Sequence, residues 1–274
     1  MMHPPSHKLF IYTALPCEAK PLVEYFKLKK DVSIQPFTVY FNNDICLTVT
    51  GVGKSAMAAG VAFTQALFAA VEYPTILNIG VAGHRYEALG RLFFADKIID
   101  IDSERSYYPS LIYTLPSFTC GIQTVSKAQT SYHESYLCDM EASAFYETAV
   151  RFTSSEFIFC LKVVSDNEAS PAENINPKQV SNLIGTHISS LELVLEQVFK
   201  LAALIAKPEI VLWNKLIQQH HFTIAEQRQL KGLLMRWCVI TDNQHLDFDE
   251  APLGCAKDLL SWLDLKIQAT DFCL

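Results

Sequence analysis

Residues 45–56 read ICLTVTGVGKSA, and this stretch contains the unit from which the fold is built. The apolar run at 45–50 is typical of a central strand that is covered on both faces. Gly51 and Gly53 follow it at once, as in a tight turn in which side chains would be in the way. A helical pattern then runs from Ser55 to Val71. The stretch therefore predicts a strand that turns directly into a helix.

The same alternation extends along the chain as far as Asn176. Further β-type runs end in small or polar residues, at 8–15, 75–80, 93–102 and 157–164. Helical patterns occupy Glu18–Lys27 and Met140–Phe152. Strands that alternate with helices predict an α/β sandwich with a largely parallel sheet.

Beyond Asn176 the pattern is helical throughout. Helices are expected over 178–206, as one long element, and over 208–221, 223–240 and 256–267. Thr223 and Glu226 have the spacing of a capping box. We therefore expect an α/β domain at 8–206 and a helical C-terminal extension at 207–274. The extension shows no catalytic cluster, which favours an appendage that packs on the core or on a partner.

The composition narrows the classes of function. The chain has 274 residues, 50% of them hydrophobic, with a formal net charge of -7 and a pI of about 5.6. This acidic balance argues against a nucleic-acid partner and favours a small-molecule one. The eight cysteines include no Cys-x-x-Cys pair, so we expect reduced thiols in a cytoplasmic protein and no structural zinc site. No signal peptide or membrane span is expected, because no apolar run reaches roughly 18 residues.

Three carboxylates stand at the ends or starts of the predicted elements, where α/β sheets bind ligands. Asp166 follows the run at 157–164, and it could act as a general acid with a raised pKa or cap the next loop. Glu18 lies in the first turn of a predicted helix, where it complements the helix dipole. Glu141 leads the apolar helix face of CDMEASAFYETAV (138–150), although a buried carboxylate is costly unless something pairs with it.

Two glycine motifs leave alternatives open. GVGKSA (51–56) is not a P-loop, because position 48 is Thr, but it fits a dinucleotide fingerprint with Glu72 at about the right distance for a ribose contact. It also fits a tight turn, or a turn whose backbone N–H groups, such as that of Gly53, face a ligand. In NIGVAG (78–83) two glycines and an alanine leave the backbone bare for a flat ligand or for close helix packing.

Taken together, Glu18, TGVGK, NIGVAG, DMEASAF and VSDN occur in the order seen in the nucleoside phosphorylase/nucleosidase superfamily. Over roughly residues 8–200 the chain most resembles the methylthioadenosine/S-adenosylhomocysteine nucleosidase branch. The resemblance implies a three-layer α/β/α sandwich with a mixed sheet. It also implies cleavage of the N-glycosidic bond of a purine nucleoside, without a metal or other cofactor, by a homodimer.

The resemblance also assigns roles to the carboxylates. Asp166, oriented by Ser165, would protonate or hydrogen-bond N7 of the leaving purine, and Glu18 would position and deprotonate the attacking water. An acid at the departing base and a base for the nucleophile are what an oxocarbenium-like transition state requires. Glu141 would accept hydrogen bonds from the ribose 2′- and 3′-hydroxyls, which strengthen as positive charge develops.

The remaining substrate contacts come from the same resemblance. The backbone of Met140 would lie near the ribose, while Ala82 and Gly83 would form the floor under the base and sugar. Tyr107 and His133 are candidates for wrapping the substrate, with a surface loop or a subunit contact as the alternative. The segment before the DMEA motif departs from the pattern of the branch, with Ser126-Lys127 in place of Gly-Asp, so the base and the 5′-substituent stay open.

Hydrolysis is favoured over phosphorolysis. Phosphorylases of this superfamily typically carry an arginine in the strand before the glycine turn, where this chain has Asn78 in TILNIG. A dianionic nucleophile is poorly held without a guanidinium. Arg85, Arg91 and Arg105 keep the phosphorylase open as an alternative, since any of them could fold over the site. A nucleoside-binding protein that has lost turnover is the other alternative.

Overall fold

The computed structural model describes residues 7–68, 73–128, 135–205, 211–241, 246 and 255–270. They belong to two compact units, Met1–Leu204 and Ile205–Leu274. Among the described helices, none combines the length and the hydropathy that crossing a bilayer requires.

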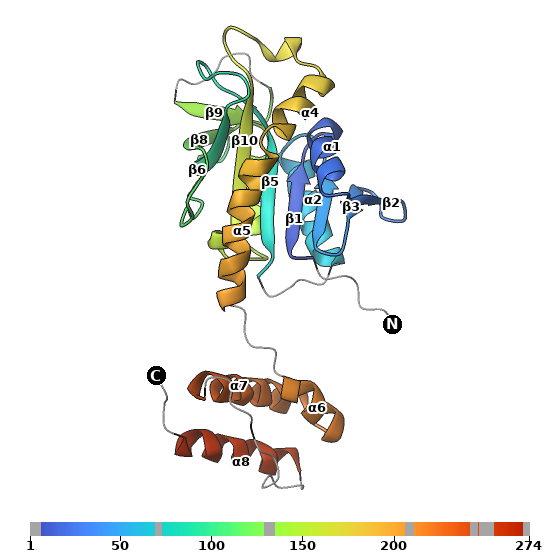
Figure 1. Ribbon diagram of the computed structural model, residues 1–274, viewed down its shortest axis with the longest axis vertical. Helices are drawn as coiled ribbons and strands as arrows, with labels where there is room; N and C mark the ends of the chain where they lie inside the picture. The colour runs from blue at the N-terminus through green and yellow to red at the C-terminus, as the bar shows by residue number, and fades with distance from the viewer. Residues whose placement is uncertain are drawn as a thin grey trace. The chain divides into compact units, whose positions relative to one another are not determined.

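The first unit is built on a mixed sheet (Figure 1). Its long strands are β1 (Leu9–Thr13), β4 (Ile45–Val49), β5 (Thr75–Gly83), β6 (Leu92–Asp100), β8 (Phe118–Thr124) and β10 (Ile158–Asp166). Its short strands are β2 (Lys29–Asp31), β3 (Thr38–Phe41), β7 (Ser106–Tyr107) and β9 (Tyr136–Asp139). Parallel ladders join β4, β1, β5 and β10, so the carboxyl ends of these strands share one edge.

The sheet curls back on itself at that edge. β6 pairs antiparallel with β10 and parallel with β8, which in turn pairs with β9. β9 then meets the end of β5, where Gly83 is paired with Cys138. Because Gly83 is also paired with Asp166, the end of β5 is flanked by β9 on one edge and by β10 on the other.

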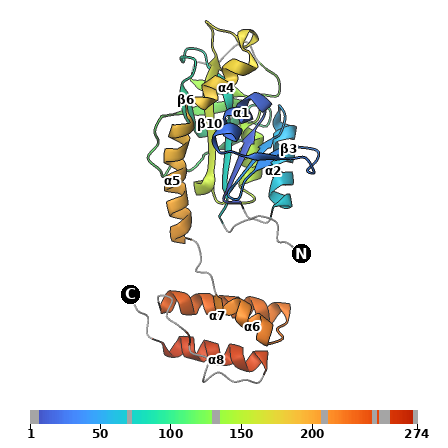
Figure 2. The ribbon, with the colours of Figure 1, turned by 45° about the vertical axis from the view of Figure 1, so that its right-hand side comes forward.

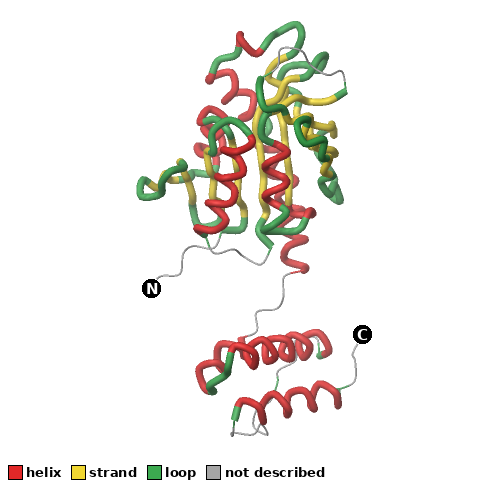
Figure 3. Tube along the Cα trace, turned by 180° about the vertical axis from the view of Figure 1, so that it is seen from behind, coloured by secondary structure: helices red, strands yellow, loops and turns green. Residues whose placement is uncertain are grey.

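Helices cover both faces of the sheet, as Figures 2 and 3 show. On one face lie α1 (Pro16–Tyr25), α4 (Pro177–Gly185) and α5 (Ile188–Ile205), and on the other α2 (Lys54–Leu67) and α3 (Ala142–Ala149). The three-layer α/β/α sandwich that the sequence predicts is therefore confirmed.

The alternation of side chains along β10 shows how the two cores form. Phe159, Leu161 and Val163 belong to the core under α1, α4 and α5, whereas Cys160 and Val164 belong to the core under α2 and α3. This is the two-residue period of a strand. Every residue of β10 is buried, which explains why Lys162 is the only residue from Ile158 to Val164 that is not apolar.

One predicted helix is wrong. The element expected over 178–206 is two helices, α4 and α5, because the chain turns at Thr186 and His187. The hydroxyl of Thr186 donates back to the carbonyl of Leu183 at 2.8 Å, and Nε2 of His187 lies 2.6 Å from the carbonyl oxygen of Gly90. A tertiary contact thus fixes the break, which follows directly on Gly185, the last residue of α4.

The second unit contains α6 (Val211–Gln219), α7 (Ile224–Ile240) and α8 (Ala256–Ala269). Its core is apolar and includes Leu216, Leu230, Leu234, Leu259 and Leu263. The predicted capping box is confirmed, because the amide of Glu226 donates to the Thr223 hydroxyl at 3.3 Å and the amide of Thr223 donates to the Glu226 carboxylate at 2.8 Å.

Candidate active site

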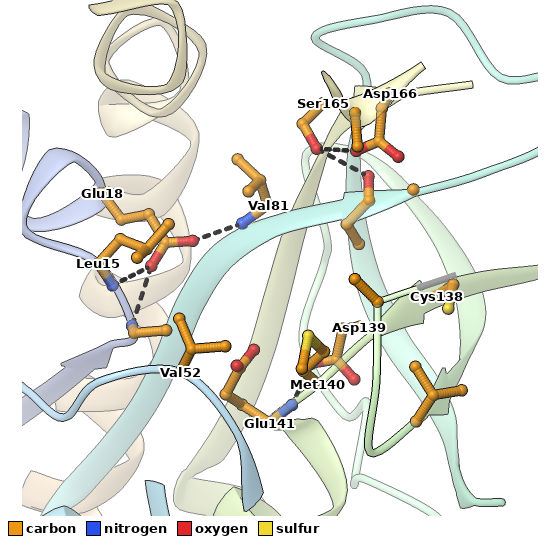
Figure 4. Close-up of a pocket in the computed structure, with 16 residues that line it drawn as sticks. Leu15, Glu18, Val52, Val81, Cys138, Asp139, Met140, Glu141, Ser165 and Asp166 are labelled. Atoms are coloured by element: carbon orange, nitrogen blue, oxygen red, sulfur yellow. Dashed lines mark hydrogen bonds between the residues drawn. The ribbon is translucent and has the colours of Figure 1, made fainter. Parts of the chain in front are cut away.

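A cavity of ≈ 180 Å³ lies at the carboxyl ends of the strands. The predicted site residues that line it are Glu18, Ala82, Gly83, Met140, Glu141, Ser165 and Asp166 (Figure 4). The rest of the lining is mostly apolar: Ala14, Leu15, Val52, Val81, Val125, Ala128, Cys138, Asp139 and Ala172. The fold thus brings together three carboxylates that are far apart in the sequence.

Glu18 lies in the first turn of α1, which begins at Pro16, a favourable residue for a first helical position. One carboxylate oxygen accepts the amides of Ala14 and Leu15, each at 2.9 Å, and the other accepts the amide of Val81 at 3.0 Å. Burial raises the pKa of Glu18, while these bonds act in the opposite direction. The carboxylate is therefore fixed in place at the edge of the cavity.

Gly80 shows why this part of β5 lacks a side chain. A Cβ there would lie 2.8 Å from an oxygen of Glu18 and 3.5 Å from Nζ of Lys162. The sequence left open whether the glycines of NIGVAG serve a ligand or helix packing. For Gly80, the structure gives the approach of two buried charged side chains as the reason.

Glu141 is held by the glycine turn that follows β4. The backbone N–H of Gly53, a residue with a φ of +99°, donates to Oε1 of Glu141 at 2.8 Å. Gly53 was expected to face a ligand, but it does not line the cavity, and its backbone N–H binds Glu141 instead. Burial raises the pKa of Glu141 to about 7, with Asp139 adding to the shift and Lys162 opposing it.

The side chain of Asp139, and not that of Glu141, caps the start of α3. The Asp139 carboxylate accepts the amides of Glu141 at 3.2 Å and Ala142 at 2.8 Å, and thereby caps the start of α3. It also accepts the Thr124 hydroxyl at 2.7 Å. Because Asp139 takes the capping role, the side chain of Glu141 is available to the cavity.

Ser165 and Asp166 reach the cavity from the end of β10. The pairing of β10 with β5 shifts register between Val164 and Asp166, which lets consecutive side chains, both buried, line one cavity. The hydroxyl of Ser165 donates to Oδ1 of Asp166 at 2.5 Å, and it also contacts the carbonyl of Ala82 at 3.4 Å (Figure 4). Ser165 thus fixes the orientation of the Asp166 carboxylate.

Lys162 is the charged residue that the sequence reasoning missed. It is 1% exposed in the middle of β10, and its ammonium lies 2.8 Å from Oδ2 of Asp139. Burial lowers the pKa of Lys162, but Asp139, Glu141 and Glu18 more than offset this effect and raise it. A cation therefore lies beneath the carboxylates of the site. The signal was a single lysine inside the apolar run FIFCLKVV (157–164).

Of the two residues expected to wrap the substrate, Tyr107 is described and does not line the cavity. Tyr107 lies in β7, and its ring packs against Tyr146 with the ring centres 5.8 Å apart. His133 lies outside the described residues, as does Glu72. His84 is absent from the lining, and its Nδ1 accepts the backbone amides of Tyr86 and Glu87, each at 3.2 Å.

The three arginines that kept phosphorolysis open are also absent from the described lining. Arg85 pairs with Glu168 at 3.4 Å, Arg91 pairs with Glu87 at 2.5 Å, and Arg105 pairs with Glu147 at 2.9 Å. The amide of Asn78, which occupies the position expected for a phosphate-binding arginine, donates to the backbone carbonyl of Tyr12 at 3.0 Å. Within the described residues, no set of three or more His, Cys, Asp or Glu side chains is placed to hold a metal ion.

Comparison with known proteins identifies the fold. Neither a protein-family model nor a curated protein sequence matches the chain. The structure of the 5′-methylthioadenosine/S-adenosylhomocysteine nucleosidase from S. pneumoniae with the transition-state inhibitor MT-ImmA matches with a TM-score of 0.54 and 18% identity, over 68% of this chain and 97% of that one. The corresponding nucleosidase from Colwellia psychrerythraea 34H, in complex with adenine, gives 0.55 and 17%, over 72% and 97%.

A plant protein gives the same result. The 5′-methylthioadenosine nucleosidase from Arabidopsis thaliana, in its apo form, matches with a TM-score of 0.55 and 15% identity, over 71% of this chain and 96% of that one. The chain therefore has the fold of these nucleosidases over almost the whole of their length, as the sequence resemblance implied.

Proposed function

We propose that this chain hydrolyses the N-glycosidic bond of a purine nucleoside, with 5′-modified adenosines such as 5′-methylthioadenosine as the substrate class. The observation that carries the proposal is the convergence of Glu18, Glu141 and Asp166 on one cavity. A sugar that leaves its base as an oxocarbenium-like cation needs a negative group near the ring, a proton for the base and a base for water.

Glu141 holds the ribose in this proposal. One of its oxygens is occupied by the Gly53 amide, which leaves the other for the 2′- and 3′-hydroxyls. As positive charge develops on the sugar, the hydroxyls become better donors, and their bonds to an ionised carboxylate strengthen. Binding that improves in the transition state accelerates the reaction.

Asp166 serves the leaving base and Glu18 serves the water. The hydroxyl of Ser165 donates to Oδ1 of Asp166, which directs the other oxygen of the carboxyl to N7 of the purine. Glu18 is fixed by three amides on the other side of the cavity, and burial raises its pKa toward the range of an effective general base. The two roles thus fall on groups from different elements, α1 and β10.

Water rather than phosphate is the nucleophile in this proposal. The described lining contains carboxylates and no arginine, so a phosphate dianion would meet repulsion and no bidentate partner. Lys162 lies next to the site, but its ammonium is paired with Asp139 at 2.8 Å. The buried charges of the cavity therefore favour a neutral nucleophile.

We also propose that the protein is a cytoplasmic homodimer. The described cysteines are free thiols, which suits a reducing compartment. Val52, on the cavity lining, is 51% exposed, and an exposed apolar side chain there suits a surface that a second copy covers. Light scattering on the eluting peak of a gel-filtration column tests the dimer, and a monomeric mass at micromolar concentration contradicts it.

A panel of nucleosides tests the activity. The purified protein is incubated with 5′-methylthioadenosine, S-adenosylhomocysteine, adenosine and inosine, with and without phosphate, and free base is measured by chromatography. Base release that does not depend on phosphate supports the proposal. Release only with phosphate, together with a sugar 1-phosphate, favours a phosphorylase. Tight binding without release favours a binding protein that has lost turnover.

A further inference from the structure

Asp100 joins the starts of two helices. It ends β6, is 7% exposed and has no place in the cavity lining. Its carboxylate oxygens lie 2.9 and 3.2 Å from Nζ of Lys54, and Oδ2 accepts the Ser143 hydroxyl at 2.7 Å. The amide of Ser103 donates to Oδ1 at 2.9 Å. Burial alone raises the pKa of Asp100, but these bonds hold it well below its usual range.

The two side chains that Asp100 binds, those of Lys54 and Ser143, are close in sequence to Gly53 and Glu141, which are hydrogen-bonded to each other. Lys54 follows Gly53 and is the first residue of α2. Ser143 lies two residues after Glu141, in the first turn of α3. The hydrogen bond from Gly53 to Glu141 thus runs between two helix starts, and Asp100 binds both starts.

The glycine turn has few side chains of its own to fix it. Apart from the two neighbouring residues, no described atom lies within 4 Å of the point where a Cβ on Gly53 would be, and the side chain of Val52 is half exposed. Backbone bonds hold the beginning of the turn, where the amide of Thr50 donates to Thr13, the last residue of β1, and that of Gly51 to Ala14. Lys54 is the first residue beyond Gly53 whose side chain ties the turn to another element.

We propose that Asp100, together with Lys54 and Ser143, is a positioning residue that sets the Gly53 amide against the Glu141 carboxylate. Asp100 acts through these residues and does not itself touch the cavity. Its effect on catalysis rests on the proposed function of Glu141, whereas its effect on the Gly53–Glu141 bond does not. Misplacing a group by about an ångström is enough to cost a large factor in rate.

Asp102 provides a matched control. Its carboxylate also contacts Nζ of Lys54, at 2.5 Å, but its side chain is 55% exposed. Its second partner is the hydroxyl of Ser126, and no described bond joins it to α3. Asp102→Asn and Asp100→Asn therefore each remove one carboxylate from Lys54, while only Asp100→Asn weakens the link between the two helices.

Nuclear magnetic resonance can observe the bond directly. Val52–Gly53 is the only Val–Gly pair in the sequence, so ¹³C-carbonyl valine with ¹⁵N-glycine isolates the Gly53 amide signal. In the parent protein we expect this amide shift to follow the ionisation of Glu141, with a midpoint near its pKa of about 7. Glu141→Gln abolishes the titration and so identifies its source, although Glu18, Asp139 and Lys162 also face Glu141.

The variants then decide the proposal. We expect Asp100→Asn and Ser143→Ala each to reduce the amplitude of the Gly53 titration by at least about two-fold, and Asp102→Asn to leave it unchanged. Ser143→Ala is the milder change and serves if Asp100→Asn does not fold, which near-ultraviolet circular dichroism shows. Parent-like amplitudes in both folded variants, or an equal loss in Asp102→Asn, overturn the proposal.

Kinetics separate this inference from the proposed function. With 5′-methylthioadenosine as the probe, we expect kcat/KM to fall about ten-fold in Asp100→Asn and less than about two-fold in Asp102→Asn. If the parent protein releases no base, the proposed function fails, and the Gly53 titration still decides the positioning role. If Asp100→Asn keeps parent kcat/KM while the parent is active, the positioning role is wrong for catalysis.

Discussion

The two units of this chain treat charge in opposite ways. The α/β unit buries carboxylates and a lysine at one edge of its sheet, namely Glu18, Asp139, Glu141, Lys162 and Asp166. In the described part of the helical unit, Thr241 is the only buried polar residue, and its hydroxyl donates to the carbonyl of Trp237 at 2.7 Å. Buried charge costs free energy unless it is paired, and its concentration at one edge is the reason why we propose the active site there.

Lys162→Met is expected to have the largest effect on stability. It replaces the buried lysine by an apolar side chain of the kind that fills the core of the helical unit. It leaves the Asp139 carboxylate, with a side chain 0% exposed, without its cation. Removing one partner of a buried pair costs about 3–5 kcal/mol in the free energy of unfolding. Denaturant unfolding at pH 7.5 measures this loss, with Lys162→Arg as the control that keeps the charge. An unchanged denaturation midpoint in Lys162→Met contradicts the pairing.

Asp166→Asn and Glu141→Gln, at the same edge of the sheet, should reduce activity without reducing stability. We expect each to lower kcat/KM at least about 100-fold, or about 2.7 kcal/mol in the transition state. Asp166→Asn removes the acid for the leaving base, and Glu141→Gln removes the negative charge that stabilises the cationic sugar. The free energy of unfolding should be unchanged or higher, since a neutral amide is cheaper to bury. Near-full turnover of the true substrate by both variants shows that the assigned roles are wrong.

In the α/β unit, activity and stability should change in opposite directions with pH. The folded-state pKa of Glu141 is about 7, above its ordinary value of 4.5. Between these pH values the folded state retains a proton on Glu141 that the unfolded state releases. Proton binding therefore favours the folded state at low pH, and the free energy of unfolding decreases as the pH rises through this window. Activity that needs ionised Glu141 rises over the same window. Rate profiles and urea midpoints from pH 5 to 8 measure both trends. Glu141→Gln should weaken the stability trend, and Glu18, whose pKa burial also raises, accounts for what is left.

The smallest effect is expected in the helical unit. Arg236 and Asp264 approach to 3.9 Å there with side chains 59% and 40% exposed, and such pairs contribute less than about 1 kcal/mol. Arg236→Gln should therefore shift the unfolding midpoint little and leave kcat/KM unchanged. A loss of activity comparable to that in Glu141→Gln would show that this unit contributes to the reaction.

The sequence predicts the buried central strands of the α/β unit better than its half-exposed strands. The central strands and the carboxylates at their ends were accessible, because buried parallel strands are continuous apolar runs and ligand sites follow them. β8 and β9 were missed because both mix exposed or half-exposed positions with polar residues, so neither forms a continuous run. A single glycine inside a helical pattern is ambiguous, so Gly185 alone does not predict the break between α4 and α5, which the contact of His187 with Gly90 fixes.

The chemistry of the site was predictable only in part. Glu18, Glu141 and Asp166 could be identified at element boundaries, whereas Lys162 was hidden inside a run counted as apolar. The roles of Asp139 as the cap of α3 and of Gly53 as the partner of Glu141 depend on pairings between distant segments. No local pattern encodes such pairings, because they arise where the sheet curls and closes.

The decisive measurement is the release of adenine from 5′-methylthioadenosine in phosphate-free buffer, compared between the parent protein and Asp166→Asn. We predict that the parent protein releases adenine together with the free sugar, and that Asp166→Asn does so at least about 100 times more slowly. Adenine release that requires phosphate, or that Asp166→Asn catalyses at the parent rate, would contradict hydrolysis through the buried carboxylates.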